Sequence, residues 1–286
     1  MSEKIAIYGN TSQDASLESL PRLFKFLVER GFQVEVYNRF ARYLKEHGVD
    51  MGKMEIVEDV SRDVALVVSL GGDGTFLRAA RWIGMLELPI LGINTGHLGF
   101  LASCSLPDSE ELISNFFEKR VSLERRMLLE ISSASLPADQ WHYALNEVAF
   151  MRLGSSMLDI DAYADDTLLA NYRGDGLIVS TPTGSTAYSL SAGGPVIEPT
   201  IDCICLTPVA PHTLTLRPLV IGADSTLRLI PKSRSGQFIL SYDDRATLLP
   251  VDGEFYIRRA PYVAVVVRKK DESFPSILRQ KLLWNN

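Results

Sequence analysis

One aspartate set among glycines is the residue of this chain best placed to do chemistry. Asp73 lies in Gly-Gly-Asp-Gly-Thr at 71–75, directly after the valine-rich apolar run 64–70. The run predicts a buried strand, and the apolar spacing that follows predicts a helix with Thr75 as its N-cap. Glycines bring backbone N–H groups close to an anion, and the positive end of a helix favours negative charge. The stretch therefore suits a phosphate with a carboxylate beside it, unless Asp-Gly is simply a turn.

A second stretch, 173–195, is dense in glycine, serine and threonine. Gly-Asp-Gly at 174–176 gives a second acidic turn, 177–179 predicts a strand, and 181–185 predicts a polar loop that could open a short helix. Hydroxyl and backbone N–H groups there can hydrogen-bond a polar ligand, and Tyr188 offers a flat ring for stacking. The alternative is that these side chains cap turns and helices without touching a ligand.

Composition and charge narrow the class of protein. With 286 residues, 46% of them apolar, the chain is long enough for two domains with cores of their own. A formal charge of −6 indicates no basic surface for nucleic acid, and no basic amphipathic helix predicts a membrane surface. Residues 1–7 lack the features of a signal peptide, and no apolar run reaches membrane-spanning length. We therefore expect a cytoplasmic protein that binds neither nucleic acid nor membrane.

Cysteine and histidine residues give no clear metal pattern. Cys104, Cys203 and Cys205 are an odd number, with no disulfide framework. Cys203 and Cys205 would share one face of a strand, but His212 is the only obvious histidine nearby and a closed zinc site needs four ligands. We expect buried structural thiols. His97 could act as a base, but a lone loop histidine is more often a structural hydrogen-bonding group, which is the role we expect.

Strands and helices alternate in the first part of the chain. The expected strands are 4–8, 32–37, 64–70 and 89–94, and the expected helices are 16–29, 40–47, 75–85 and 108–118. This alternation predicts an α/β domain with a mostly parallel sheet and crossover helices. Ligands of such sheets bind at the carboxyl ends of strands, where Asp73 and Asn94 would both lie.

Short strands separated by turns follow from about residue 123, and they predict an all-β domain. They are expected at 127–131, 144–153, 157–163, 177–180, 225–230, 237–242, 254–258 and 262–267. Few helical patterns lie between them.

The last segment, 273–284, returns to helical spacing. Its apolar face consists of Ile277, Leu278, Leu282 and Leu283. A lone helix after a β domain must bury that face, so we expect it to pack back on the first domain. The expected division is thus an α/β domain at 1–123, with 272–286 returning to it, and an all-β domain at 124–271.

Together these stretches resemble the NAD kinase family. The matching segments run in order along nearly the whole chain: 71–75, 94–100, 146–147, 174–195, 211–219 and 274–284. The Gly-Gly-Asp-Gly-Thr turn alone is a weak signal, because lipid kinases and phosphofructokinases carry similar turns, whereas the stretch at 174–195 is specific. No Gly-x-Gly-x-x-Gly follows the first strand and no Walker A lysine is present, so neither ordinary dinucleotide nor P-loop mechanics applies.

The resemblance implies an enzyme that moves the terminal phosphoryl group of ATP to the 2′-hydroxyl of the adenosine ribose of NAD, which yields NADP. It makes Asp73 the base that accepts the hydroxyl proton, and it puts Gly74 and Arg78 near phosphates. The other substrate-binding residues that it implies are Phe100 and Tyr188 against the dinucleotide, Asn146 and Glu147 at its adenosine half, Asp175 at its nicotinamide end, and Thr186, Ala187, Ser189, Leu190 and Ser191 along the same groove. Domain 1–123 would then bind the nucleotide, and domain 124–271 would bind NAD.

The resemblance also implies a cofactor and an assembly. Mg²⁺, or another divalent cation, would act with ATP, and because it usually binds through phosphates and few protein ligands, no dedicated metal site is expected. Family members assemble as homodimers or homotetramers, in which a neighbouring subunit can contribute to the site. Two rivals stay open: a lipid kinase with the same turn, and a non-catalytic NADP-binding regulator, against which the presence of Asp73 argues. The sequence also leaves open whether ATP or polyphosphate is the donor, and whether NAD or NADH is the acceptor.

Overall fold

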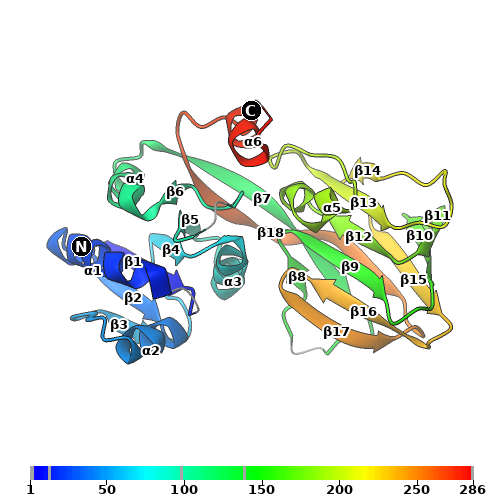
Figure 1. The fold of residues 1–286 in the computed structure, drawn as a ribbon, viewed down its shortest axis with the longest axis horizontal. Helices are drawn as coiled ribbons and strands as arrows, with labels where there is room; N and C mark the ends of the chain where they lie inside the picture. Colours follow the sequence, from blue (N-terminus) through cyan, green and yellow to red (C-terminus); the bar gives the residue numbers. More distant parts are fainter. Residues whose placement is uncertain (1–2, 12–13, 97–98, 138–139, 285–286) are drawn as a thin grey trace. The chain divides into compact units, whose positions relative to one another are not determined.

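The computed structural model describes residues 3–11, 14–96, 99–137 and 140–284. It divides into two compact units (Figure 1). Unit 1 comprises residues Met1–Arg125 and Ala264–Asn286, and unit 2 comprises residues Arg126–Val263. The chain re-enters unit 1 at Ala264, earlier than the boundary expected at 271, because the last part of strand β18 (Phe255–Lys269) pairs with the sheet of that unit.

A parallel sheet forms the centre of unit 1 (Figure 1). In spatial order its strands are the end of β18, β5 (Pro89–Asn94), β4 (Leu66–Leu70), β1 (Lys4–Gly9), β2 (Gln33–Tyr37) and β3 (Glu55–Val57), and β6 (Cys104–Ser105) also pairs with β5. These pairings are all parallel. Every residue of β4 is buried, which explains its nearly continuous apolar sequence. The predicted α/β architecture with a mostly parallel sheet is confirmed.

Amphipathic helices connect these strands. They are α1 (Leu20–Glu29), α2 (Asn38–Glu46), α3 (Asp73–Ile83) and α4 (Ser109–Phe117), with 3₁₀ turns at η1 (Asp14–Ser19), η2 (Gly84–Leu86) and η3 (Leu106–Asp108). Helix α1 begins at Leu20 rather than at 16, with Pro21 in its first turn, where the missing N–H costs no helical hydrogen bond. Its buried residues Leu23 and Leu27 join strand residues such as Val68 in one apolar core.

Unit 2 is built from antiparallel strands. One sheet has the order β14-β13-β12-β9-β16-β17, and its strands are β14 (Leu219–Gly222), β13 (Cys203–Val209), β12 (Gly176–Ser180), β9 (Glu147–Arg152), β16 (Gln237–Tyr242) and β17 (Arg245–Pro250). A second set consists of β11 (Thr167–Gly174), β10 (Leu158–Ala164), β15 (Leu227–Ser233) and the first part of β18, while β7 (Val121–Ser132) pairs with β8 (Tyr143–Ala144). The short helices are η4 (Thr183–Thr186) and α5 (Tyr188–Ser191). The predicted all-β character of this half is confirmed.

Aromatic side chains join the two sets of strands in unit 2. The rings of Phe150 and Phe238 stack with centroids 5.5 Å apart, and the ring of Phe255 meets each of them edge-on at 5.4 Å. All three side chains are fully buried. Such pairs stabilise a core by about 0.5–1.5 kcal/mol beyond the burial of their area. The strands expected separately at 254–258 and 262–267 are one strand, β18, which continues through Pro261.

The terminal helix α6 (Phe274–Leu282) is part of unit 1. Its N-cap, Ser273, accepts a hydrogen bond from the N–H of Ser276, so the helix starts where the sequence predicted. Ile277 and Leu278 are buried, as expected, but Leu283 lies beyond the helix in a left-handed conformation and is 64% exposed. The expectation that Leu283 belongs to the buried face is therefore wrong. No helix in the described part of the chain is long and apolar enough to cross a membrane.

We predict that Leu278→Ala lowers the free energy of unfolding by about 2–4 kcal/mol, because it removes a buried side chain and leaves a cavity. The matched control is Leu283→Ala, the same change at an exposed position, which should alter it by less than about 0.5 kcal/mol. Urea unfolding followed by circular dichroism measures both. Equal effects of the two substitutions would show that α6 does not pack through Leu278.

Candidate active site

The glycine-rich turn places Asp73 at the start of a helix. Helix α3 begins at Asp73 with Gly72 as its N-cap, and the N–H of Phe76 already donates to the carbonyl of Gly72 over 3.1 Å. The expectation that Thr75 is the N-cap is wrong: Thr75 lies inside the first helical turn and is 2% exposed. The turn is made earlier because Gly71 adopts φ +152°, where a side chain would also come within 2.4 Å of the Thr75 hydroxyl.

A neighbouring loop fixes the Asp73 carboxylate. The N–H of Phe100 donates to Oδ2 over 2.8 Å, and the N–H of Leu101 donates to Oδ1 over 3.0 Å. The backbone approaches so closely that a Cβ at Gly99 would lie 2.0 Å from Oδ1. Since each carboxylate oxygen can accept more than one hydrogen bond, both retain acceptor capacity. Asp73 is therefore an oriented carboxylate rather than a plain turn residue.

The surroundings of Asp73 include groups suited to a phosphate. Gly74 is open among the described residues, where a Cβ would meet only the Arg78 guanidinium, at 3.7 Å. Arg78 itself donates to the Thr75 hydroxyl over 3.2 Å. On helix α6, burial lowers the pKa of Lys281, while the negative charge of Asp73 acts in the opposite direction. The sequence did not single out Lys281, because only the fold brings α6 toward Asp73. The loop histidine His97 lies outside the described residues.

In unit 2, a second aspartate holds the Asn146-Glu147 pair. The Asp243 carboxylate accepts N–H bonds from Leu145 and Asn146, both over 2.8 Å, and from Glu147 over 3.3 Å. Asp243 lies in the turn between β16 and β17 with φ +50°, a conformation that aspartate tolerates better than most residues. The sequence did not single out Asp243, because an aspartate in a hairpin turn is ordinary and its partners are distant backbone N–H groups.

The loop after β12 also holds the backbone of Leu145 and Asn146. Thr181 donates its N–H to the carbonyl of Asn146 over 2.9 Å and its hydroxyl to the carbonyl of Leu145 over 2.6 Å. A Cβ at Gly184 would lie 2.0 Å from the Asn146 carbonyl oxygen, so glycine is required there. The structure thus places Asn146 beside Thr181 and Gly184, at the start of the 183–191 segment.

Burial changes the protonation of this region. It raises the pKa of Glu147 to about 8, with the nearby charge of Asp243 adding to the effect and the N–H of Tyr188 opposing it. Burial also raises the pKa of Asp243 to about 6, against the lowering effect of its three N–H bonds. The Oε2 atom of Glu147 is buried without a hydrogen-bond partner among the described residues. Glu147 is therefore protonated near neutral pH and can donate a hydrogen bond to a ligand.

Several hydroxyls of the 183–191 segment serve the fold. Ser185 donates to the Pro182 carbonyl over 2.7 Å, and Ser189 shares a 2.8 Å hydrogen bond with Thr207. Ser189 is fully buried, so its hydroxyl is occupied internally. Tyr188 is 38% exposed, and Ser191 also lies at the surface. Of the predicted groove residues in α5, Tyr188 and Ser191 are thus available to a ligand, whereas Ser189 packs the segment.

Asp175 is separated from the other predicted residues of unit 2. It precedes β12, whereas the 181–185 loop follows it, and Glu147 pairs with Ser180 at that far end. The intervening strand of five residues is about 16 Å long. Asp175 instead forms an ion pair with Arg152 at 2.5 Å and is 41% exposed.

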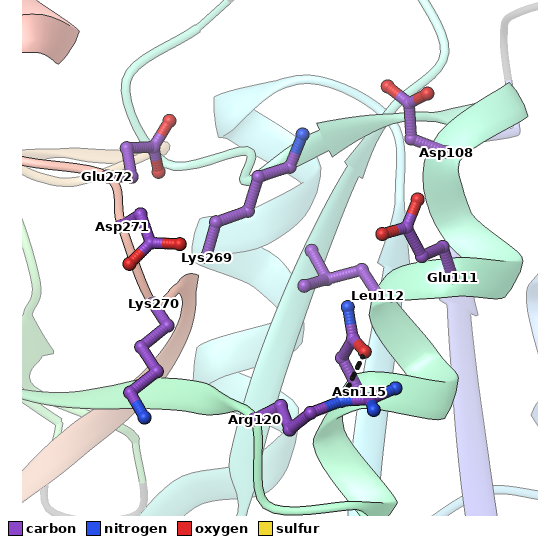
Figure 2. A pocket seen from close by; sticks show the side chains of 9 residues that line it. All are labelled: Asp108, Glu111, Leu112, Asn115, Arg120, Lys269, Lys270, Asp271 and Glu272. Atoms are coloured by element: carbon purple, nitrogen blue, oxygen red, sulfur yellow. Dashed lines mark hydrogen bonds between the residues drawn. The ribbon is translucent and has the colours of Figure 1, made fainter.

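A cavity of about 370 Å³ also lies in unit 1 (Figure 2). It is lined by Asp108, Glu111, Leu112, Asn115, Arg120, Lys269, Lys270, Asp271 and Glu272. Figure 2 shows acidic and basic side chains facing the same space, and Arg120 is engaged by Asn115 over 3.1 Å. None of the predicted site residues lines it.

The three cysteines are buried free thiols, as expected, and burial raises the pKa of Cys104 to about 12.

An oriented carboxylate at a glycine-rich helix start, in a parallel α/β unit, suits an enzyme of phosphoryl transfer, a reaction that depends mainly on positioning and charge stabilisation. Comparison with known proteins narrows that class. Residues 5–121 match the family model of the ATP-NAD kinase N-terminal domain, and residues 145–269 match that of the ATP-NAD kinase C-terminal domain. The chain belongs to the ATP-NAD kinase family.

Relatives and solved structures agree with this assignment. The chain is 41% identical to an NAD kinase of Bacteroides fragilis, over 98% of each chain, and 39% identical to one of Porphyromonas gingivalis, over 99% of this chain and 98% of the relative. An NAD kinase from Archaeoglobus fulgidus, solved in complex with ATP, is 28% identical with a TM-score of 0.72 and covers 96% of this chain and 98% of its own. Yeast NADH kinase in complex with NADH shares the fold, with a TM-score of 0.86 at 24% identity, over 100% of this chain and 89% of its own.

We predict that Glu147→Gln removes a pH dependence of stability. The folded pKa of Glu147, about 8, exceeds its ordinary value of 4.5, so unfolding releases a proton between these values and stability falls as pH rises through this window. Glutamine keeps the neutral shape and lacks this loss. Relative to the wild type, the variant should gain on the order of 1–3 kcal/mol between pH 5 and pH 8. Urea unfolding across that range measures it, and parallel stability curves would contradict the assignment.

Proposed function

We propose that this chain transfers the terminal phosphoryl group of ATP to the 2′-hydroxyl of the adenosine ribose of NAD, and so produces NADP. The observation that carries the proposal is the Asp73 carboxylate, held by the N–H groups of Phe100 and Leu101 at the start of α3. Membership of the ATP-NAD kinase family supports the substrates. The relatives give no support to a lipid kinase or to a non-catalytic regulator.

In this proposal Asp73 is the general base. Phosphoryl transfer asks the protein mainly for positioning and charge stabilisation. A carboxylate within hydrogen-bond reach of the attacking hydroxyl contributes roughly 10²–10⁴ in rate. The two N–H bonds fix the direction in which the remaining acceptor capacity of Asp73 points. Open Gly74 and the Arg78 guanidinium are proposed to lie beside phosphate, and Phe100 to pack on the dinucleotide.

Unit 1 is proposed to bind ATP and to supply the base, and unit 2 to bind NAD. In unit 2 the side chains of Asn146 and Glu147 would hydrogen-bond the adenosine half of NAD, with Tyr188 against the dinucleotide. Asp243 holds the backbone N–H groups of both residues and Thr181 binds the Asn146 carbonyl, so these contacts leave the Asn146 side chain and the Glu147 Oε2 atom to a ligand. Asp175 is proposed for the nicotinamide end, and Thr186, Ala187, Ser189, Leu190 and Ser191 for the lining of the groove, where buried Ser189 would act through packing.

A divalent cation is proposed to act with ATP. In the described part of the chain, no group of three or more histidine, cysteine or acidic side chains is placed to hold a metal ion. Mg²⁺ typically keeps several waters and binds through phosphates plus one or two carboxylates, so Asp73 suffices as the nearby acidic group. The ion would supply charge neutralisation on the transferred phosphoryl group.

We also propose that the chain works in the cytoplasm as a homodimer or homotetramer. The position of Asp175, a strand's length from Asn146 and Glu147, favours a second copy contributing to each site. Turnover with ATP and with polyphosphate, each offered separately with NAD or NADH and Mg²⁺, would define donor and acceptor.

We predict that Asp73→Asn lowers kcat by roughly 10²–10⁴, equivalent to about 3–5 kcal/mol of barrier, because asparagine cannot accept the proton. The amide also turns an N–H donor toward either Phe100 or Leu101, so a modest loss of stability, about 1–3 kcal/mol, should accompany it. NADP formation by the folded variant, with NAD binding measured in parallel, tests the role. A loss below about tenfold, with chemistry as the slow step, would contradict it.

We predict that Asn146→Ala weakens NAD binding with little effect on stability. The backbone bonds to Asp243 and Thr181 do not depend on the Asn146 side chain, so the fold of this turn should persist. Loss of side-chain hydrogen bonds to the ligand should raise the Kd for NAD by about 10- to 100-fold. Calorimetric titration and a melting curve measure the two effects. Unfolding with unchanged affinity in the folded fraction would make the residue structural.

A further inference from the structure

A buried arginine lies behind the loop that holds Asp73. Arg268, near the end of β18, is 3% exposed. Its Nη2 donates to the carbonyl of Phe100 over 2.7 Å, and its Nη1 donates to the carbonyl of Ala102 over 3.4 Å. Its Nε faces Glu124 Oε2 at 3.5 Å. The guanidinium thus donates to two loop carbonyls, while its Nε, which has no hydrogen-bond partner among the described residues, is paired with Glu124 by charge alone.

One peptide group connects this arginine to Asp73. The carbonyl of Phe100 and the N–H of Leu101 belong to the same peptide unit. Its oxygen accepts from Arg268, and its N–H donates to Asp73 Oδ1 over 3.0 Å. A cation at the carbonyl polarises the peptide and makes the N–H a stronger donor. Arg268 therefore acts on Asp73 through a single peptide bond without touching it.

We propose that Arg268 is a positioning residue of the phosphoryl transfer, which orients the Asp73 carboxylate through the Phe100–Leu101 peptide, with Glu124 holding the guanidinium in place. The inference rests on the proposed role of Asp73 as the base. Burying a guanidinium is costly unless it is well paired, and the same loop is already tied to β18, where the Ser103 hydroxyl donates to the carbonyl of Val267 over 2.5 Å. A charged residue is thus more than attachment of the loop requires.

The test is kinetic. Arg268→Lys keeps the charge but cannot reproduce the planar fork that spans two carbonyls. We expect kcat to fall by about 10- to 100-fold, because small displacements of a catalytic group cost that much, with the KM values for NAD and ATP within about threefold. Glu124→Gln should give a smaller fall in kcat of the same kind. The matched control is Arg258→Lys on the same strand, where the arginine is exposed and paired with Glu130, and it should leave kcat within twofold.

A double-mutant cycle separates positioning from stability. In the Asp73→Asn background, Arg268→Lys should cause almost no further fall in kcat, since the group through which it acts is already lost. Circular dichroism melting confirms that each variant is folded at the assay temperature. If a variant proves unstable there, Arg268→Ala with added guanidinium ion replaces it, and the ion should restore kcat.

Three results would contradict the positioning role of Arg268. An unchanged kcat in Arg268→Lys, a loss of kcat that multiplies with that of Asp73→Asn, or the absence of rescue by guanidinium would overturn the positioning role. The failure of the proposed function is recognised separately. If Asp73→Asn alone keeps its activity, the base assignment fails and the inference about Arg268 falls with it.

Discussion

The hydrogen bonds from the N–H groups of Phe100 and Leu101 to the Asp73 carboxylate are the interaction on which the site of unit 1 depends. They require the loop that follows β5 to lie beside the end of β4, and the parallel pairing of β4 with β5 brings the ends of these two strands together. They also require backbone to approach side chain without a Cβ at Gly99. The parallel sheet, the glycine and the carboxylate are therefore parts of one arrangement, and none of them positions a base without the others.

Unit 2 uses the same device for a different purpose. There the Asp243 carboxylate accepts three successive N–H groups and fixes the backbone that carries Asn146 and Glu147. In unit 1 the backbone orients a reactive carboxylate, whereas in unit 2 a carboxylate orients the backbone. Charge-assisted bonds of this kind are stronger than neutral ones and fix direction, which serves precision in both cases.

The sequence predicted the parts of the site that depend on neighbouring residues along the chain. The apolar run of β4, the glycine-rich turn and Asp73 could be recognised because a buried strand and a tight turn have their own composition. The prediction that Thr75 is the N-cap was wrong, because the unusual φ of Gly71 lets the helix start earlier than side-chain preference suggests. The prediction that Leu283 belongs to the buried face was wrong, because the apolar periodicity does not show where the helix ends.

Residues that act through long-range contacts could not be predicted in this way. Asp243 lies 97 positions from Asn146, and Arg268 lies 168 positions from Phe100. An arginine near the end of a strand or an aspartate in a hairpin turn is ordinary in sequence. Their partners are backbone N–H and carbonyl groups, which every residue carries and which leave no trace in side-chain type. The family resemblance reaches residues of recognisable chemistry, but it does not reveal which residues hold them.

The buried charged groups lower the stability of the fold in order to position these sites. Glu147 and Asp243 both have raised pKa values because burial disfavours their ionised forms, and Arg268 is buried among main-chain oxygens. Apolar residues of similar size would make a more stable interior. The cost is tolerable because each charge is tied to backbone hydrogen bonds, or, for Glu147, is removed by protonation near neutral pH. The interior is thus less stable next to Asp73 and beside Asn146, where side chains and backbone groups must keep a fixed orientation. The aromatic core of Phe150, Phe238 and Phe255, which orients no ligand-binding group, is apolar.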